Sequence, residues 1–143
     1  MIIGYAYVCA DILNVGHINH LQACRELCDR LIVGVLTNQA VMEKKVEPII
    51  SFEDRLRTVQ SLGCVDVVVA QEAYSPLPNA TAMRVDILFE STSHAPEAIE
   101  EARKQICAYG GQVIVMPYYG VVSSSAIKRK IKKEWKDQNE EPK

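Results

Sequence analysis

Two histidines lie just after an apolar run near the start of the chain, in the segment VCADILNVGHINHL (8–21). His17 and His20 are three residues apart, so on a helix they would share one face. A helix that begins here, beyond the end of a buried strand, would offer unpaired N–H groups and a partial positive charge to a phosphate. Gly16 allows a close backbone approach, and His17 could donate a hydrogen bond to a phosphoryl oxygen. The segment therefore indicates phosphate binding, with a local helix cap as the structural alternative for His17.

Two later segments carry further groups that suit an anion. Lys44 and Lys45 precede a helix expected to begin at Ser51, and Arg55 lies in the first turns of that helix. Three serines at 123–125 open a last helix, and such a helix start leaves N–H groups free for an anion. The structural alternatives are a solvated lysine pair, an exposed position for the arginine and a plain serine N-cap.

The elements that must position these groups alternate between strands and helices. Short β-branched runs predict strands at 2–9, 30–37, 65–70, 85–90 and 112–118. Helical spacing lies between most of them, with one long irregular connection at 71–82 and a last helix at 123–135. This alternation predicts one α/β domain of the Rossmann-like type, a five-stranded parallel sheet with helices on both faces. The domain is expected to span residues 1–135, followed by a polar C-terminal tail at 136–143.

The composition excludes several classes of protein. A chain of 143 residues with 48% hydrophobic residues suits a single globular domain and not a disordered chain. The net charge of −2 argues against nucleic-acid binding by bulk electrostatics, although residues 128–143 hold seven basic and four acidic side chains. The five cysteines form no C-x-x-C pair and are expected to be buried thiols in a reducing compartment. The N-terminal apolar run lacks the features of a signal peptide, so we expect a cytoplasmic protein without integral membrane association.

Taken in order, these segments resemble the nucleotidyltransferase superfamily of cytidylyltransferases and small adenylyltransferases. The first segment is similar to the signature G-x-F-D-x-x-H-x-G-H and matches it at Asp11, Gly16 and His17. Residues 36–69 are similar to the family's run K…P…ER…L…L..VD.VV and align with it without a gap. Residues 122–127 resemble its I-S-S-T-x-I element, in which hydroxyls at a helix start bind phosphate.

The sequence departs from the family pattern at several places. Val8, Ala10 and Asn14 stand where the family has a glycine, an aromatic residue and the first histidine. Tyr118 stands at an arginine position, and the family's G-x-D element after the fourth strand is replaced by STSH (91–94). Because asparagine and tyrosine are neutral near pH 7, two phosphate-facing groups that can carry positive charge are missing.

If the protein is an enzyme, we expect Lys128, Arg129 or His20 to supply part of the missing positive charge. The basic helix could alternatively dock on an anionic membrane or a nucleic acid, but its basic residues fall on most of its faces. We therefore expect neither a nucleic acid nor a membrane as its partner.

The resemblance implies that the chain transfers a nucleotidyl group from a nucleoside triphosphate to a small phosphate or phosphonate acceptor and releases pyrophosphate. CTP is the favoured donor, with an ATP-dependent adenylyltransferase as the alternative enzyme and a weak or inactive nucleotide sensor as the alternative without turnover. Mg²⁺ would accompany the triphosphate, no protein side chain is predicted as a metal ligand, and a homodimer is expected.

The resemblance also assigns roles to individual residues. The catalytic pair would be His17 and Lys44. The residues implied for nucleotide or phosphate binding are Cys9, Ala10, Asp11, Asn14, Gly16, His20, Arg55, Tyr118, Val122, Ser123, Ser124 and Ser125. The loop that would hold the acceptor or the base comprises Glu90, Ser91, Thr92, Ser93 and His94.

Overall fold

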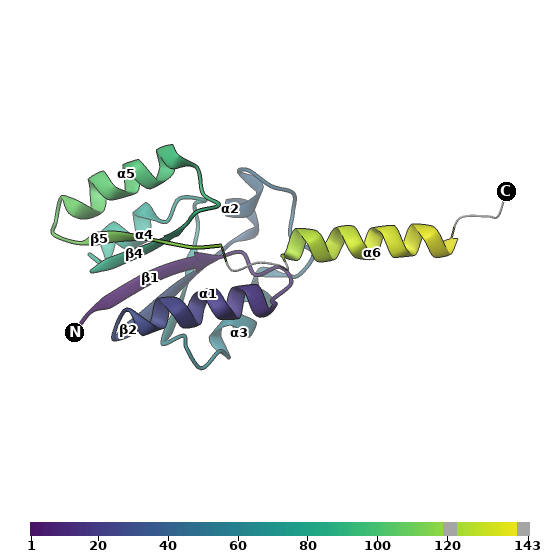
Figure 1. The fold of residues 1–143 in the computed structure, drawn as a ribbon, viewed down its shortest axis with the longest axis horizontal. Coiled ribbons are helices and arrows are strands. Elements are labelled where there is room, and N and C mark those ends of the chain that lie inside the picture. The colour runs from purple at the N-terminus through teal and green to yellow at the C-terminus, as the bar shows by residue number, and fades with distance from the viewer. Residues whose placement is uncertain (119–122, 140–143) are drawn as a thin grey trace.

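The computed structural model describes residues 1–118 and 123–139, and the description of the fold is confined to these. Its strands are β1 (Ile3–Val8), β2 (Arg30–Leu36), β3 (Val67–Gln71), β4 (Ile87–Ser91) and β5 (Gln112–Met116). Its helices are α1 (Val15–Glu26), α2 (Asn38–Met42), α3 (Phe52–Gln60), α4 (Leu77–Ala82), α5 (Pro96–Cys107) and α6 (Ser124–Asn139). The strands pair in parallel in the order β3-β2-β1-β4-β5 (Figure 1). The predicted α/β sheet is therefore confirmed.

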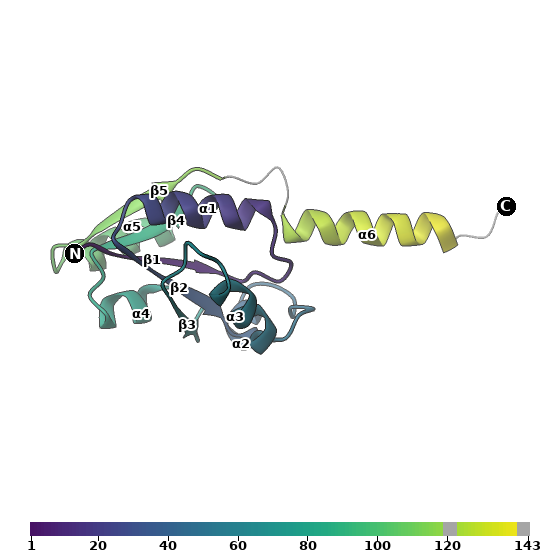
Figure 2. The same cartoon turned by 90° about the horizontal axis from the view of Figure 1, so that it is seen from below.

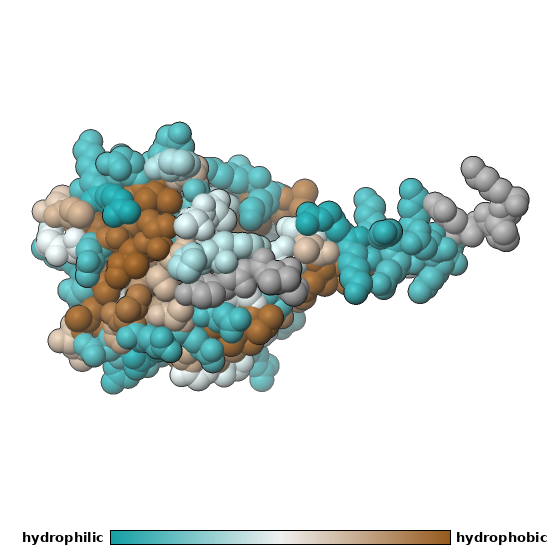
Figure 3. All heavy atoms as spheres, in the orientation of Figure 1, coloured by the Kyte–Doolittle hydropathy of each residue, from teal (hydrophilic) through white to brown (hydrophobic). Residues whose placement is uncertain are grey.

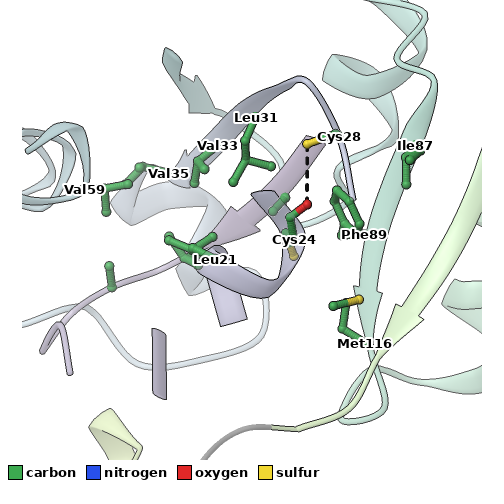
Figure 4. Close-up of a cluster of buried hydrophobic side chains, with 13 residues drawn as sticks. Leu21, Cys24, Cys28, Leu31, Val33, Val35, Val59, Ile87, Phe89 and Met116 are labelled. Atoms are coloured by element: carbon green, nitrogen blue, oxygen red, sulfur yellow. Dashed lines mark hydrogen bonds between the residues drawn. The ribbon is translucent and has the colours of Figure 1, made fainter. Parts of the chain in front are cut away.

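Helices cover both faces of the sheet, as the sequence predicts. On one face, Leu21 and Cys24 of α1 and Val59 of α3 pack against inward-facing residues of β1, β2 and β4 (Figure 4). On the other face, Ala80 of α4 and Ile106 of α5 pack with the alternate residues of the same strands. Successive strand side chains point to opposite faces, which is why both layers form from one sheet.

The structure corrects the sequence-based boundaries at three places. The stretch 71–82, expected to be irregular, contains α4, because its two prolines lie at the start of the helix, where no N–H is needed for an intrahelical bond. The short helix α2 follows β2, capped by Thr37, and was not expected. The last helix continues to Asn139, beyond the expected end at 135, and the rest of the expected tail, 140–143, lies outside the described residues.

Helix α6 extends away from the sheet and its covering helices (Figures 1 and 2). No side chain of α6 is buried, and its surface is hydrophilic along most of its length (Figure 3). Its first turns are tied to the loop after β1: Ser124 bonds to Ile12, and Lys128 pairs with Asp11. In the described ranges, no helix is long and apolar enough to cross a membrane.

The side chain of Arg55 is fully buried and holds the ends of two strands together. Its guanidinium donates to the carbonyl oxygens of Cys9 at 2.8 Å and Leu36 at 2.7 Å, the residues at the carboxyl ends of β1 and β2. It also donates to Ile50 O at 3.1 Å and to Asn38 Oδ1 at 2.7 Å. This burial excludes the structural alternative of an exposed helix position. Every one of these bonds is internal, so the direct nucleotide contact implied by the resemblance does not follow from this geometry.

We expect Arg55→Ala to lower the free energy of unfolding by about 3 kcal/mol or more, because it leaves several buried acceptors without a donor. Arg57→Ala is the matched control, since Arg57 lies on the exposed face of the same helix and should change stability by less than about 0.5 kcal/mol. Urea unfolding of both variants measures the difference. Equal stability of the two variants would refute the internal role of Arg55, and Arg55→Lys, which keeps the charge without the fork, should fall between them.

Candidate functional site

A pocket of about 680 Å³ opens at the carboxyl ends of the strands, between the loops that follow β1 and β4 and the start of α6. The chain winds outward from β1 in both directions, and such a reversal of strand order leaves a crevice beyond the strand ends. The three histidines of the chain, His17, His20 and His94, all line this pocket. The sheet thus brings together side chains that are far apart in the sequence.

His17 lies at the start of α1, where Asn14 is the N-cap. Asn14 Oδ1 accepts from Gly16 N at 2.9 Å, and His17 Nδ1 accepts from Asn14 N at 3.2 Å. Because Nδ1 accepts a hydrogen bond, the neutral ring carries its proton on Nε2, which becomes a donor. Burial lowers the pKa of His17, so the neutral form predominates near pH 7. Asn14 Nδ2 donates to Ile12 O, so both polar ends of its side chain serve the local loop.

Asp11 is buried and organises the loop before α3. Its carboxylate accepts from Ile49 N at 3.1 Å and Ile50 N at 2.9 Å, and it pairs with Lys128 of α6. Burial alone would raise the pKa of this carboxyl, but the bonds from Lys128, Ile50 and Ile49 outweigh it and hold the pKa below its usual value. Asp11 is therefore an ionised structural anchor. The preceding residue, Ala10, has a left-handed φ of 55°, which marks the sharp turn after β1.

The three serines at the start of α6 differ in their hydrogen bonds. Ser123 Oγ accepts from Ala126 N at 3.1 Å and caps the helix. Ser124 Oγ accepts from Ile12 N and donates to Ile12 O, which joins α6 to the loop after β1. Among the described residues, Ser125 alone of the three has a hydroxyl without a hydrogen-bond partner, and it lines the pocket.

The permanent positive charges in the pocket come from Lys45, Lys128 and Arg129, while Asp11 is the carboxylate among the lining residues that the structure describes. Lys128, Arg129 and His20 all line the pocket, but Lys128 is paired with Asp11 and the lowered pKa of His20 keeps that ring neutral near pH 7. Lys44 is not brought to His17: its Nζ lies 5.1 Å from the centre of the Tyr74 ring, in a neighbouring pocket.

The end of β4 places a buried carboxylate next to a histidine of the loop that follows. Glu90 Oε2 lies 2.5 Å from His94 Nδ1, and Tyr7 OH donates to the same oxygen at 2.8 Å. The rings of Tyr7 and His94 stack with centroids 5.2 Å apart. Burial and the adjacent Glu90 raise the pKa of Tyr7, so its phenol stays protonated and remains a donor. Tyr7 was not among the expected site residues, and its place at the end of a strand would have been the signal.

The other expected residues are distributed around the pocket. Cys9, Gly16, Ser91, Ser93 and the exposed Tyr118 line it, and burial raises the pKa of the Cys9 thiol, which stays protonated. Burial lowers the pKa of His20, and the nearby His94 and His17 lower it further. Thr92 lies in the same loop as Ser91 but is not part of the lining, and Val122 lies outside the described residues.

The described residues contain no group of three or more histidine, cysteine or acidic side chains that could hold a metal ion. The carboxylate of Asp11 is already bonded to two backbone N–H groups and a lysine. This set of donors does not fit a metal ion held by the protein alone.

Comparisons with known proteins identify the family to which this chain belongs. Two curated relatives, both named bifunctional protein HldE, are 36% identical over 127 residues in Proteus mirabilis and 31% identical over 132 residues in Trichlorobacter lovleyi. These matches cover 87% and 91% of this chain but 27% of each relative, so the chain spans about a quarter of the length of those relatives.

A solved structure, that of the lipopolysaccharide core biosynthesis protein from Thermoplasma volcanium, is 25% identical with a TM-score of 0.71. The match covers 82% of this chain and 96% of that one. A model of the cytidylyltransferase-like family matches residues 5–130, which include most of β1, the other four strands and the start of α6. The chain therefore belongs to the cytidylyltransferase-like family, within the nucleotidyltransferase superfamily.

Proposed function

We propose that this protein transfers a nucleotidyl group from a nucleoside triphosphate to a small acceptor that carries a phosphate or a phosphonate, with release of pyrophosphate. The observation that carries the proposal is the charge of the pocket. Its one carboxylate among the described lining residues, Asp11, is paired with Lys128, so that Lys45 and Arg129 leave the pocket with a net positive charge. Such a pocket at the starts of two helices suits a polyphosphate.

His17 is the residue best placed to stabilise the reacting phosphate. The acceptor oxygen attacks the α-phosphorus, a new P–O bond forms, and pyrophosphate leaves with the electrons of the broken bond. Negative charge grows on the α-phosphoryl oxygens during this step, and His17 Nε2–H would donate to them. The cap bond to Asn14 fixes the ring before substrate binds, so little reorganisation is needed.

The remaining phosphates would be held by the cations and by α6. Lys45 and Arg129 would bind the β- and γ-phosphates, and Ser125 would donate its hydroxyl. Because the protein groups present do not fit a resident metal, we propose that Mg²⁺ enters as part of the triphosphate complex, held mainly by phosphate oxygens.

The choice of nucleotide needs a direct comparison. We propose CTP as the donor, in line with the sequence-based expectation and with the name of the family. The curated relatives are named as bifunctional proteins and not as cytidylyltransferases, so ATP is the competing donor to test.

A thermal-shift panel of the Mg²⁺ complexes of CTP, ATP, UTP and GTP tests the function. We expect one of them to stabilise the protein by about 2.7 kcal/mol at a hundredfold excess over its dissociation constant, with CTP first. Pyrophosphate release is then measured with that nucleotide and a panel of phosphate and phosphonate acceptors. Binding without release would make the protein a nucleotide sensor, and the absence of any nucleotide binding would overturn the proposal.

His17→Ala should lower turnover by roughly 10²-fold or more, because it removes a donor used in the transition state. It also removes a cap acceptor, so His17→Gln is the companion variant. Glutamine at this position can still accept from Asn14 N, and it should preserve the melting temperature while turnover falls. A purely structural histidine predicts a lower melting temperature with unchanged turnover per folded molecule.

Lys45→Ala should raise the KM for the nucleotide about tenfold, the effect of losing one charge-assisted hydrogen bond. Lys44→Ala should leave that KM within about twofold, since Lys44 lies in the neighbouring pocket. This order reverses the one expected from the sequence. Steady-state kinetics with the nucleotide concentration varied measure both KM values. A larger effect of Lys44→Ala, or equal effects of the two variants, would contradict this placement of the loop.

A further inference from the structure

Helix α6 carries an apolar stripe that continues past the edge of the body of the molecule, residues 1–118. Ile127, Ile131 and Trp135 are spaced by four residues and therefore share one face of the helix. Ile131 is 58% exposed and Trp135 is 65% exposed. Ser124 and Lys128 border the same face, and both contact the loop after β1. The face of α6 that begins on the body thus continues outward as a stripe whose far end is exposed.

A second group of exposed apolar side chains surrounds the point where α6 leaves the body. It consists of Val15 at the start of α1 and of Val46 and Ile49 in the loop before α3, each more than half exposed. We call these three residues the apolar rim. Ile49 N donates to Asp11, the partner of Lys128, so the rim adjoins the first turns of α6. Figure 2 shows α6 starting between α1 and the loop before α3, and Figure 3 shows hydrophobic side chains beside the start of α6.

The charges of α6 and of the body are opposite. Helix α6 contains six basic and two acidic residues, whereas the body contains nine basic and fourteen acidic residues. Close to the rim, the exposed Glu47, Glu53 and Asp54 add negative charge. Two α6 helices packed against each other would bring like charges together, whereas α6 packed on the body of another copy would bring opposite charges together. The charges therefore favour α6 on a rim over α6 on another α6.

We propose that α6 is an exchanged arm: in a symmetric dimer, Ile131 and Trp135 of each copy pack on the apolar rim of the other. Because α6 leaves the body at the rim, two antiparallel helices of about 24 Å each place the far end of one at the rim of the other. The two contacts are identical, as a twofold axis requires, so the assembly closes at two copies. The resemblance to the family implies a homodimer but assigns no surface to it.

The exchange would bring α6 of the second copy to the mouth of the pocket at the strand ends, the first pocket. Val46 belongs both to the rim and to the lining of this pocket. Lys132 directly follows Ile131 and borders the stripe, so Lys132 of the second copy would add a positive charge near bound phosphates. A nucleoside triphosphate should therefore strengthen the dimer, and the dimer should bind the nucleotide more tightly than the monomer does. This consequence, unlike the dimer itself, rests on the proposed function.

Sedimentation equilibrium of the full chain measures the dimer without any nucleotide, so its result is independent of the proposed function. Ile131→Gln on the arm and Ile49→Gln on the rim should each raise the dissociation constant about a hundredfold, because each change affects both contacts. Leu27→Gln, at an exposed apolar position at the opposite end of α1, is the matched control and should have no effect. All three side chains are exposed in the single chain, so the variants should keep its fold, which far-UV circular dichroism checks.

Mixing two variants tests the exchange itself. An equimolar mixture of Ile131→Gln and Ile49→Gln restores one intact arm on one intact rim, so it should dimerise more tightly than either variant alone. Trp135 is the single tryptophan of the chain, and its emission should move to shorter wavelength as the dimer forms. Added salt should weaken the dimer, because the contact joins opposite charges.

A chain that stays monomeric at every concentration would overturn the proposal. A dimer insensitive to Ile131→Gln, or a mixture that gains nothing, would also overturn it and would indicate a different interface. Binding of α6 to vesicles of phosphatidylcholine and phosphatidylglycerol without dimer formation would identify a membrane as the partner instead. A nucleotide that binds but leaves the dissociation constant of the dimer unchanged would refute the contribution of Lys132 to the pocket.

Discussion

The buried guanidinium of Arg55 is the interaction on which the rest of the site depends. It joins the carbonyl groups at the ends of β1 and β2 to the loop before α3, and within residues 1–118 and 123–139 no acidic side chain is among its hydrogen-bond partners. Burying such a charge is costly unless its donors are satisfied, which here requires the carbonyl groups to converge on it. The converged strand ends in turn set the position of Cys9, which lines the first pocket. A permanent positive charge thus lies directly behind the pocket wall, where it adds to the potential that attracts a phosphate.

Asp11 also holds the loop before α3, with a buried negative charge in place of the positive charge of Arg55. Its carboxylate takes two N–H groups from residues 49 and 50 and the ammonium of Lys128, so one side chain connects the turn after β1, the loop before α3 and the helix α6. The negative charge of Asp11 is balanced within the protein by these N–H groups and by Lys128. Lys45 and Arg129 therefore leave the first pocket positive, whereas the neighbouring pocket that holds Lys44 is lined by Glu43, Glu90 and Glu101 and is more acidic. This contrast is the physical reason for assigning the polyphosphate to the first pocket.

The sequence predicts the strands, the parallel sheet and the cap at Ser51 because each depends on local spacing and residue type. It predicts the gathering of His17, Ser125 and Lys128 only through the resemblance to a family, since their meeting depends on how the strands are ordered. The placement of Lys44 and Lys45 could not be predicted, because neighbouring residues in a loop point in directions that only the folded backbone decides. The burial of Arg55 had a signal: it lies four residues before Val59, on the apolar face of α3. Its charge concealed that signal, because arginine is rarely buried.

The structure shows which roles Asn14 and Tyr118 have at the positions where the family has a histidine and an arginine. Asn14 serves as an N-cap that also holds His17 in place, and Tyr118 is exposed at the pocket while Lys128 and Arg129 bring charge from α6. We propose that this altered set still transfers a nucleotidyl group. The most direct measurement follows the label of α-³²P-labelled CTP or ATP during incubation with the protein and a phosphorylated acceptor. We expect the α label to appear in a new acceptor–nucleotide product while unlabelled pyrophosphate is released. Binding of the nucleotide with the α label remaining in the triphosphate under every acceptor tested would contradict it.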